Sequence, residues 1–259
     1  MYPNLFGIEG FSMVAMILVG VIVASIIFFL FLKKEGVDKK SFLDLLIVVV
    51  FTVLVGIVFA ILFENAYEAI KISSFGGIPH WTWAMTFYGG LIGGVLTFIL
   101  LYRFYYLRHN SPIFDKILLI APGCVAIGHG FGRIGCFLSG CCYGVETYTT
   151  LDMVFPNLEG RHLPTQLIEM TFLFLLGTML VLFAFFKFTK YTSVIYLSCY
   201  ALFRFMIEFL RGDERGQLAG LSPSQYWCIV LLIGSVVVYF LAKKYIYKQE
   251  GQIDEIPNN

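Results

Sequence analysis

Seven long apolar stretches dominate this chain of 259 residues and constrain what it can fold into. Each is about long enough to cross a hydrocarbon core of roughly 30 Å as an α-helix. The stretches are continuous apolar runs, whereas the strands of a membrane β-barrel alternate apolar and polar residues. We therefore predict an all-α polytopic membrane protein with seven transmembrane helices. The predicted spans are residues 11–32, 42–63, 85–102, 117–137, 167–186, 193–210 and 227–241.

The composition agrees with a membrane protein and argues against a nucleic-acid binder. Hydrophobic residues make up 59% of the chain and charged residues only 14%, against roughly 25% charged residues in an average soluble domain. The formal net charge is +1, so the chain lacks the basic excess with which proteins attract nucleic acid. The expected surroundings are therefore a lipid bilayer, with no nucleic acid as partner.

The distribution of Lys and Arg over the loops predicts the orientation of the chain. Twelve basic residues lie in one set of alternate loops and four in the other. Because cytoplasmic loops carry the basic excess, the N-terminus is expected outside and the C-terminus in the cytoplasm. The first span has no small-residue cleavage site after it, so we interpret it as a retained helix rather than a signal peptide. We expect one membrane domain over residues 1–248, with a small external elaboration in loops 64–84 and 138–166, and a polar cytoplasmic tail at 249–259.

Four charged residues lie in or at the edge of the later predicted spans. They are two arginines and two carboxylates, Arg133, Glu169, Arg204 and Glu208; Asp44 also falls in a span, near the start of the second. A charge at the centre of a membrane helix costs about 2.5–3.5 kcal/mol on insertion scales, so such residues face a cavity, form pairs or bind a charged ligand. Arg204 and Glu208 are four residues apart and can pair on one helix face. Arg133 has no carboxylate three or four residues away, so an anion such as a lipid phosphate is a candidate partner for its guanidinium.

His129 lies four residues before Arg133, which would place both on one face of a helix. It is a candidate base or phosphate donor, with an ordinary packed histidine as the alternative. The spans around these residues are rich in glycine. Glycine at that density fits either close helix packing or a cavity lined by broken helices, and the sequence leaves both open.

The chain contains six cysteines, of which three are clustered in sequence. Cys136, Cys141 and Cys142 are expected near the outer face. Three roles remain open for them: structural thiols or a disulfide, a catalytic thiol activated by a neighbouring cation, or a metal site. Their spacing matches no zinc pattern with a second pair of ligands.

Four segments, in the same order along the chain, resemble motifs of the bacterial prolipoprotein diacylglyceryl transferase family. Residues 132–140 (GRIGCFLSG) resemble its signature Gly-Arg-x-Gly-Asn-Phe-x-Asn-Gly, and residues 88–93 (YGGLIG) resemble His-Gly-Gly-x-x-Gly. Residues 161–169 (RHLPTQLIE) resemble Arg-His-Pro-Ser-Gln-x-x-Glu. Residues 200–211 (YALFRFMIEFLR) resemble Tyr-x-x-x-Arg-Phe-x-x-Glu-Phe-x-Arg, and Gly220, Ser222 and Gln225 fit the segment before the family's last helix.

The resemblance implies a membrane-embedded transferase. Members of the family transfer the diacylglyceryl group of phosphatidylglycerol to the lipobox cysteine of a preprolipoprotein, form a thioether and release glycerol phosphate. They are multi-pass proteins of the bacterial plasma (inner) membrane with the active site toward the outer leaflet, and the resemblance implies no metal and no other cofactor. The alternatives are a divergent paralogue that moves a lipid group to another acceptor, and a non-catalytic lipid-binding or transport protein.

The resemblance also assigns roles to individual positions of this chain. Two arginines belong beside the phosphate that departs, because negative charge develops there. The residues that match catalytic positions or could serve them are Tyr88, His129, Arg133, Tyr200 and Arg204. The candidate substrate-binding residues are Gly89, Gly90, Gly135, Cys136, Ser139, Gly144, His162, Gln166, Glu169, Glu208 and Arg211.

The chain departs from the family pattern at several polar positions. Tyr88 stands where the family has His, Cys136 and Ser139 stand where it has Asn, and Cys141 replaces an acidic residue. The two arginines, Tyr200, Glu208 and Gly144 are retained. His129 is therefore a candidate for the base, and Tyr88 could orient water or the leaving group.

Overall fold

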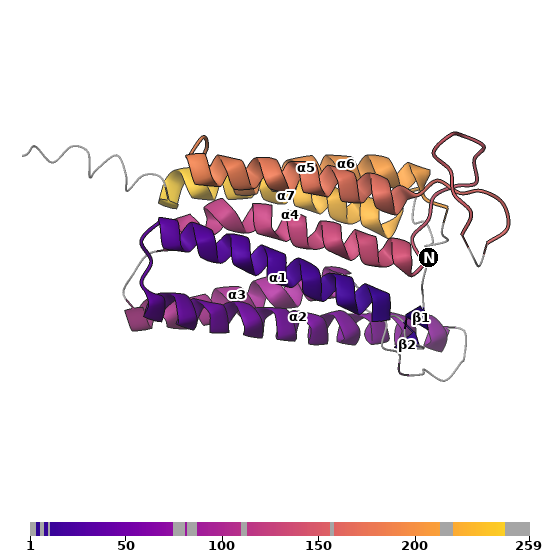
Figure 1. The fold of residues 1–259 in the computed structure, drawn as a ribbon. Coiled ribbons are helices and arrows are strands. Elements are labelled where there is room, and N and C mark those ends of the chain that lie inside the picture. The colour runs from indigo at the N-terminus through magenta and orange to yellow at the C-terminus, as the bar shows by residue number, and fades with distance from the viewer. Residues whose placement is uncertain are drawn as a thin grey trace, which may run out of the picture. The chain divides into compact units, whose positions relative to one another are not determined.

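The structure, a computed structural model, describes residues 4–5, 8–9, 11–74, 81, 87–109, 113–155, 158–212 and 220–246. The named elements within these ranges are helices and a hairpin of two short strands, β1 (Asn4–Leu5) and β2 (Ile8–Glu9). Loops with a few isolated β-bridges connect them. The described part of each of the seven predicted spans falls on a helix, and the sixth span continues past its α-helix into a 3-10 turn at Glu208–Leu210 (Figure 1). The helices are α1 (Phe11–Lys34), α2 (Lys39–Ser74), α3 (Phe87–His109), α4 (Phe114–Leu138), α5 (Thr165–Phe186), α6 (Thr192–Ile207) and α7 (Pro223–Leu241).

The helix lengths and composition confirm a polytopic membrane protein. Six of the described helices are long and apolar enough to cross a membrane, and α3 contains a shorter apolar stretch, Gly89–Phe104. The predicted tail at 249–259 and the start of the third predicted span, at Met85, lie outside the described residues. The inside–outside orientation remains a prediction from the loop charges.

The chain divides into two compact units, and each is described by itself. One unit comprises residues 32–113, and the other comprises residues 1–31 together with 114–259. In the first unit α2 and α3 pack along each other. Gly89 lies at this contact, where an added Cβ would come within 2.5 Å of the Phe63 Cβ, and Gly90 lies against the Gly56 backbone. The sequence left open whether these glycines allow close helix packing or line a cavity. Their contacts with α2 fit close helix packing.

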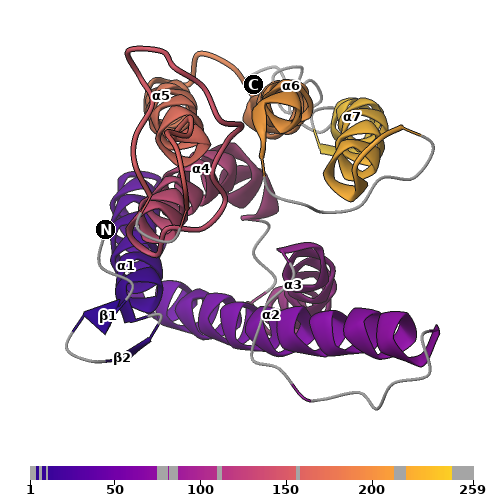
Figure 2. The ribbon, with the colours of Figure 1, turned by 90° about the vertical axis from the view of Figure 1, so that its right-hand side faces the viewer.

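The second unit is arranged around α4. Helix α5 packs along α4, α6 contacts both, and α7 packs on α6, as the view in Figure 2 shows. Helix α1 also approaches α4 closely, because a Cβ on Gly135 would lie 3.0 Å from the Met13 Cα. All four intramembrane charges identified in the sequence lie in this unit.

The segment between α4 and α5 has structure of its own. The backbone N–H of Gly144 donates to Leu163 O (2.8 Å), and that of Val145 donates to Leu210 O (2.9 Å). Within the loop, Arg161 pairs with the buried carboxylate of Asp152 at 2.9 Å. The loop is therefore joined by backbone bonds to the residues that follow α6. Its location outside the membrane stays a prediction.

Candidate functional site

An ion pair between α4 and α5 lies at the centre of the candidate site. The Arg133 Nη2 lies 2.9 Å from the Glu169 Oε1, and the Glu169 side chain is only 2% exposed. Arg133 is set on α4 and Glu169 on α5, the two helices that pack along each other. The pair gives Arg133 a carboxylate partner, which is missing at three or four residues from it along α4. Its Nε is buried and has no hydrogen-bond partner among the described residues.

Two aromatic rings complete the surroundings of the Glu169 carboxylate. The Tyr200 hydroxyl donates to Glu169 Oε1 at 3.2 Å, and the His129 Nε2 lies 3.9 Å from the same oxygen. The His129 and Tyr200 rings meet edge to face, with centroids 5.2 Å apart. Tyr196 stacks on Tyr200 with centroids 5.9 Å apart. The sequence reasoning missed Tyr196, although its position one turn before Tyr200 on α6 places it on the same helix face.

A second ion pair lies where α6 ends. The Arg204 Nη2 lies 2.6 Å from the Glu208 Oε2, so the predicted pair at four-residue spacing is formed. Arg204 Nη2 also donates to Ser224 Oγ at 3.3 Å, and Ser222 Oγ donates to Glu208 Oε1 at 2.7 Å. Ser222 is the N-cap of α7, in a reciprocal capping box with Gln225. Ser224 was not identified from the sequence, because a serine in the first turn of a helix carries no distinctive signal.

The two pairs leave a balanced cluster with unused hydrogen-bond donors. The positive charges of Arg133 and Arg204 both act on the Glu169 carboxylate. Two arginines face two carboxylates, so no net charge is buried. The Arg204 Nη1, like the Arg133 Nε, is buried without a hydrogen-bond partner in the described part of the chain. A buried guanidinium N–H normally has an acceptor, so these donors can bind oxygen atoms of an anionic ligand.

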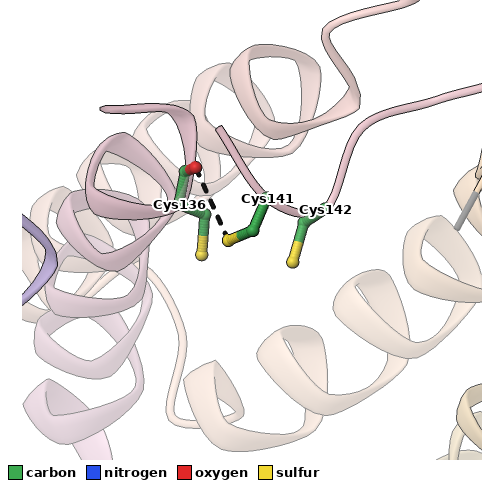
Figure 3. Close-up of side chains that lie close together, drawn as sticks. All are labelled: Cys136, Cys141 and Cys142. Atoms are coloured by element: carbon green, nitrogen blue, oxygen red, sulfur yellow. Dashed lines mark hydrogen bonds between the residues drawn. The ribbon is translucent and has the colours of Figure 1, made fainter. Parts of the chain in front are cut away.

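The three clustered cysteines lie together at the end of α4. Figure 3 shows the Cys141 thiol directed toward the main-chain oxygen of Cys136, with Cys142 beside it. Hydrogen bonds from the Cys136 and Cys141 thiols, and then the positive charge of Arg211, lower the pKa of the Cys142 thiol. The Cys141 pKa is raised, because this thiol donates to its neighbours.

Two further candidates, Gln166 and Ser139, lie beside the cysteines. Gln166 Nε2 donates to the main-chain oxygen of Cys141, and the Ser139 Oγ is buried without a partner among the described residues.

Comparisons with known proteins place the chain in a family. The family model described as prolipoprotein diacylglyceryl transferase matches residues 5–241. The chain is 32% identical to phosphatidylglycerol–prolipoprotein diacylglyceryl transferase 2 of Clostridium perfringens, over 96% of this chain and 97% of that protein. The chain belongs to the prolipoprotein diacylglyceryl transferase family. It is also 32% identical to the phosphatidylglycerol–prolipoprotein diacylglyceryl transferase of Clostridium tetani, over 91% of this chain and 94% of that protein.

In this member of the prolipoprotein diacylglyceryl transferase family, three of the four motif segments meet at one carboxylate. The signature segment supplies Arg133, the next segment supplies Glu169, and the segment on α6 supplies Tyr200. The fourth segment begins α3, in the other unit. The Tyr88 side chain lies outside the described residues, and Gly89 and Gly90 lie against α2.

Three further candidates from the family motifs serve the loop rather than the carboxylate cluster. A Cβ on Gly144 would lie 2.7 Å from Leu210 O and 2.8 Å from Leu163 O, so the closely packed backbone there requires glycine. The His162 ring nitrogens lie 3.0 Å from Gly144 O and 3.0 Å from Glu159 O. Arg211 pairs with Gly144 through the backbone. These contacts hold the segment between α4 and α5 against the end of α6.

Proposed function

We propose that the protein transfers the diacylglyceryl group of phosphatidylglycerol to the lipobox cysteine thiol of a preprolipoprotein. The carbon–oxygen bond between the diacylglyceryl group and the phosphate breaks, a thioether forms, and glycerol phosphate leaves. Support comes from membership of the family and from relatives of this name that match almost the full length of the chain.

The observation that carries this proposal is the pair of buried guanidinium groups with unused N–H donors. Arg133 Nε and Arg204 Nη1 are each buried without a partner in the described part of the chain. Each arginine is held by a carboxylate, through Glu169 for Arg133 and Glu208 for Arg204. This fixes the planar group while leaving further donors for a phosphate. Donors placed in advance beside the departing phosphate stabilise the charge that develops as the bond breaks.

The attacking thiol needs a proton acceptor, and His129 is the candidate in the described part of the site. Its Nε2 lies 3.9 Å from Glu169 Oε1, so the carboxylate can stabilise the imidazolium that proton transfer creates. The thiolate then attacks the glycerol carbon next to the phosphate ester oxygen, and the electron pair of the broken bond leaves with glycerol phosphate. Tyr200, which donates to the same carboxylate, orients it.

We also propose the setting of the reaction. The membrane domain over residues 1–248 would lie in the bacterial plasma membrane, with the active site toward the outer leaflet. The loop charges support this orientation, since twelve of the eighteen basic residues fall on the side assigned to the cytoplasm. The segments 64–84 and 138–166 would then face the side from which a translocated lipoprotein precursor arrives. Residues 64–74, expected in a loop, form the end of α2.

The test uses the purified full-length protein with labelled phosphatidylglycerol and a lipobox peptide. Transfer increases the peptide mass by one diacylglyceryl group, and glycerol phosphate appears in equal amount. The same peptide with serine in place of its cysteine is the matched control and gains no mass. Lipid that binds but stays unchanged would overturn the proposal in favour of a non-catalytic lipid-binding or transport protein. Transfer to the serine peptide would indicate another acceptor.

A further inference from the structure

Three cysteine thiols converge at the end of α4, outside the carboxylate cluster. The Sγ atoms of Cys136, Cys141 and Cys142 all lie within 4.8 Å of one another. Around a tetrahedral zinc ion with Zn–S bonds of about 2.3 Å, two sulfurs are about 3.8 Å apart. The observed spacing therefore requires only a small inward rotation of the side chains to surround one ion.

The backbone that carries these thiols is held from several sides. Cys136 belongs to the last turn of α4, and the Cys141 backbone N–H donates to Cys136 O at 3.1 Å. Thr165 Oγ1, at the start of α5, donates to Cys142 O at 2.8 Å, and Gln166 holds Cys141 O. Cys142 adopts a φ of 66°, a left-handed conformation that residues other than glycine rarely adopt. The turn is thus fixed in the conformation that brings the thiols together.

A ligand that engages all three thiols explains this arrangement better than a disulfide does. A disulfide joins only two cysteines, and none of these three forms a disulfide in the structure. Cys136 is buried, and the other two are partly buried. Three thiolates around a divalent ion carry one net negative charge, which the Arg211 guanidinium beside Cys142 can offset.

We propose that Cys136, Cys141 and Cys142 form a binding site for one thiophilic divalent metal ion, of the zinc class. Thiolate ligands select soft metal ions over magnesium and calcium. Water completes the coordination at the fourth position. Cys136 lies on α4 three residues after Arg133. An ion bound by all three thiols ties this end of α4 to the loop before α5, and so fixes the helix end that carries Arg133. The inference rests on the thiol geometry and does not depend on the proposed function.

The experiment titrates reduced full-length protein in detergent with Cd²⁺, the spectroscopic substitute for Zn²⁺. We expect a sulfur-to-cadmium charge-transfer absorption that saturates at one equivalent and disappears when Zn²⁺ displaces the cadmium. Iodoacetamide labelling of the unmutated protein, mapped by mass spectrometry, should show that Cd²⁺ protects these three cysteines from alkylation. This second readout needs no substitution and remains decisive if a variant fails to fold.

Matched substitutions separate the site from the other cysteines of the chain. Cys136→Ser, Cys141→Ser and Cys142→Ser should each weaken Cd²⁺ binding by on the order of 100-fold or more, since even losses beyond the first coordination shell weaken metal sites by 10–100-fold. Cys199→Ser and Cys228→Ser should leave binding unchanged. Absence of the absorption in reduced protein, equal weakening by Cys199→Ser, or a disulfide among the three in freshly isolated protein would each overturn the proposal.

Discussion

Arg133 and Glu169 join α4 to α5 through an ion pair with 2.9 Å between Nη2 and Oε1. In the proposed reaction this pair also organises the active groups, because Glu169 Oε1 accepts a hydrogen bond from the Tyr200 hydroxyl and lies 3.9 Å from His129 Nε2. One carboxylate thereby positions a phosphate-binding group and the candidate base. This relationship leads to predictions in which stability and activity respond differently.

Glu169→Ala should destabilise the protein strongly, and Glu169→Gln should do so less. The alanine variant leaves the Arg133 charge buried without its partner, and breaking a buried pair in this way costs about 3–5 kcal/mol. The glutamine variant keeps an oxygen that accepts from Arg133 and Tyr200 but removes the negative charge, so transfer activity should fall while the fold survives. Thermal unfolding in detergent and the lipid-transfer assay measure the two effects. Equal unfolding temperatures for the alanine variant and the parent protein would contradict the importance of the pair.

Arg133→Ala and Arg204→Ala should each abolish transfer while the protein remains folded in the membrane. Loss of one donor to a developing oxyanion lowers turnover by about 10²–10³-fold, and here the charge is lost as well. Each substitution also strands a carboxylate, so stability must be controlled. Arg133→Ala combined with Glu169→Ala removes both charges and should regain much of the unfolding temperature without regaining activity. Retained transfer by both single variants would exclude the assigned roles.

His129→Ala should reduce transfer more than Cys136→Ser does. The histidine is the proposed proton acceptor, whereas the Cys136 thiol belongs to the separate thiol cluster. Turnover rates of the two variants, measured with the same lipid and peptide, provide the comparison. The opposite order would favour a covalent thiol mechanism, and a trapped lipid adduct on Cys136, Cys141 or Cys142 would identify the nucleophile.

Much of the fold could be predicted because a hydrocarbon core imposes its thickness on the sequence. All seven apolar stretches became helices, and the Arg204–Glu208 pair followed from helical periodicity alone. The Arg133–Glu169 pair could not be predicted in this way. Its partners are separated by 36 positions and lie on different helices, so only the packing of α4 against α5 brings them together. The sequence places no carboxylate three or four residues from Arg133 on its own helix, so it indicated only an anionic ligand as the partner of this arginine.

The roles of the glycines and of His162 were equally inaccessible from the sequence. A motif match does not distinguish a glycine that admits a substrate from one that admits a neighbouring backbone. In the structure Gly144 is enclosed by the main-chain oxygens of Leu163 and Leu210, and both His162 ring nitrogens lie near main-chain oxygens. The convergence of three thiols likewise depends on the turn at 139–142, whose conformation local spacing does not specify.

Ser222→Ala should lower stability at the junction between the site and α7. The Ser222 side chain accepts from the Gln225 backbone as the N-cap of α7 and donates to Glu208 Oε1 at 2.7 Å. Loss of an N-cap costs about 0.5–2 kcal/mol, and Glu208 also loses one of its hydrogen bonds. Ser222→Thr preserves the hydroxyl and serves as the control. An unfolding temperature unchanged by alanine would show that the cap is not formed, and an effect equal to that of threonine would show that the hydroxyl is not responsible.

Gly144→Ala should impair folding of the loop rather than the chemistry. The added Cβ would lie 2.7 Å from Leu210 O and 2.8 Å from Leu163 O, and both atoms belong to backbone that is already hydrogen-bonded to this loop. Overpacking of this kind costs typically about 1–3 kcal/mol, so we expect a lower unfolding temperature and faster proteolysis between α4 and α5. Gly234→Ala on α7 is the matched control, since no atom lies within 4 Å of its added Cβ and alanine favours a helix by roughly 0.5–1 kcal/mol. Turnover per folded molecule should remain near the parent value for both variants. If Gly144→Ala instead unfolds like the parent protein but loses transfer, then Gly144 contacts the substrate, as the family motif implied.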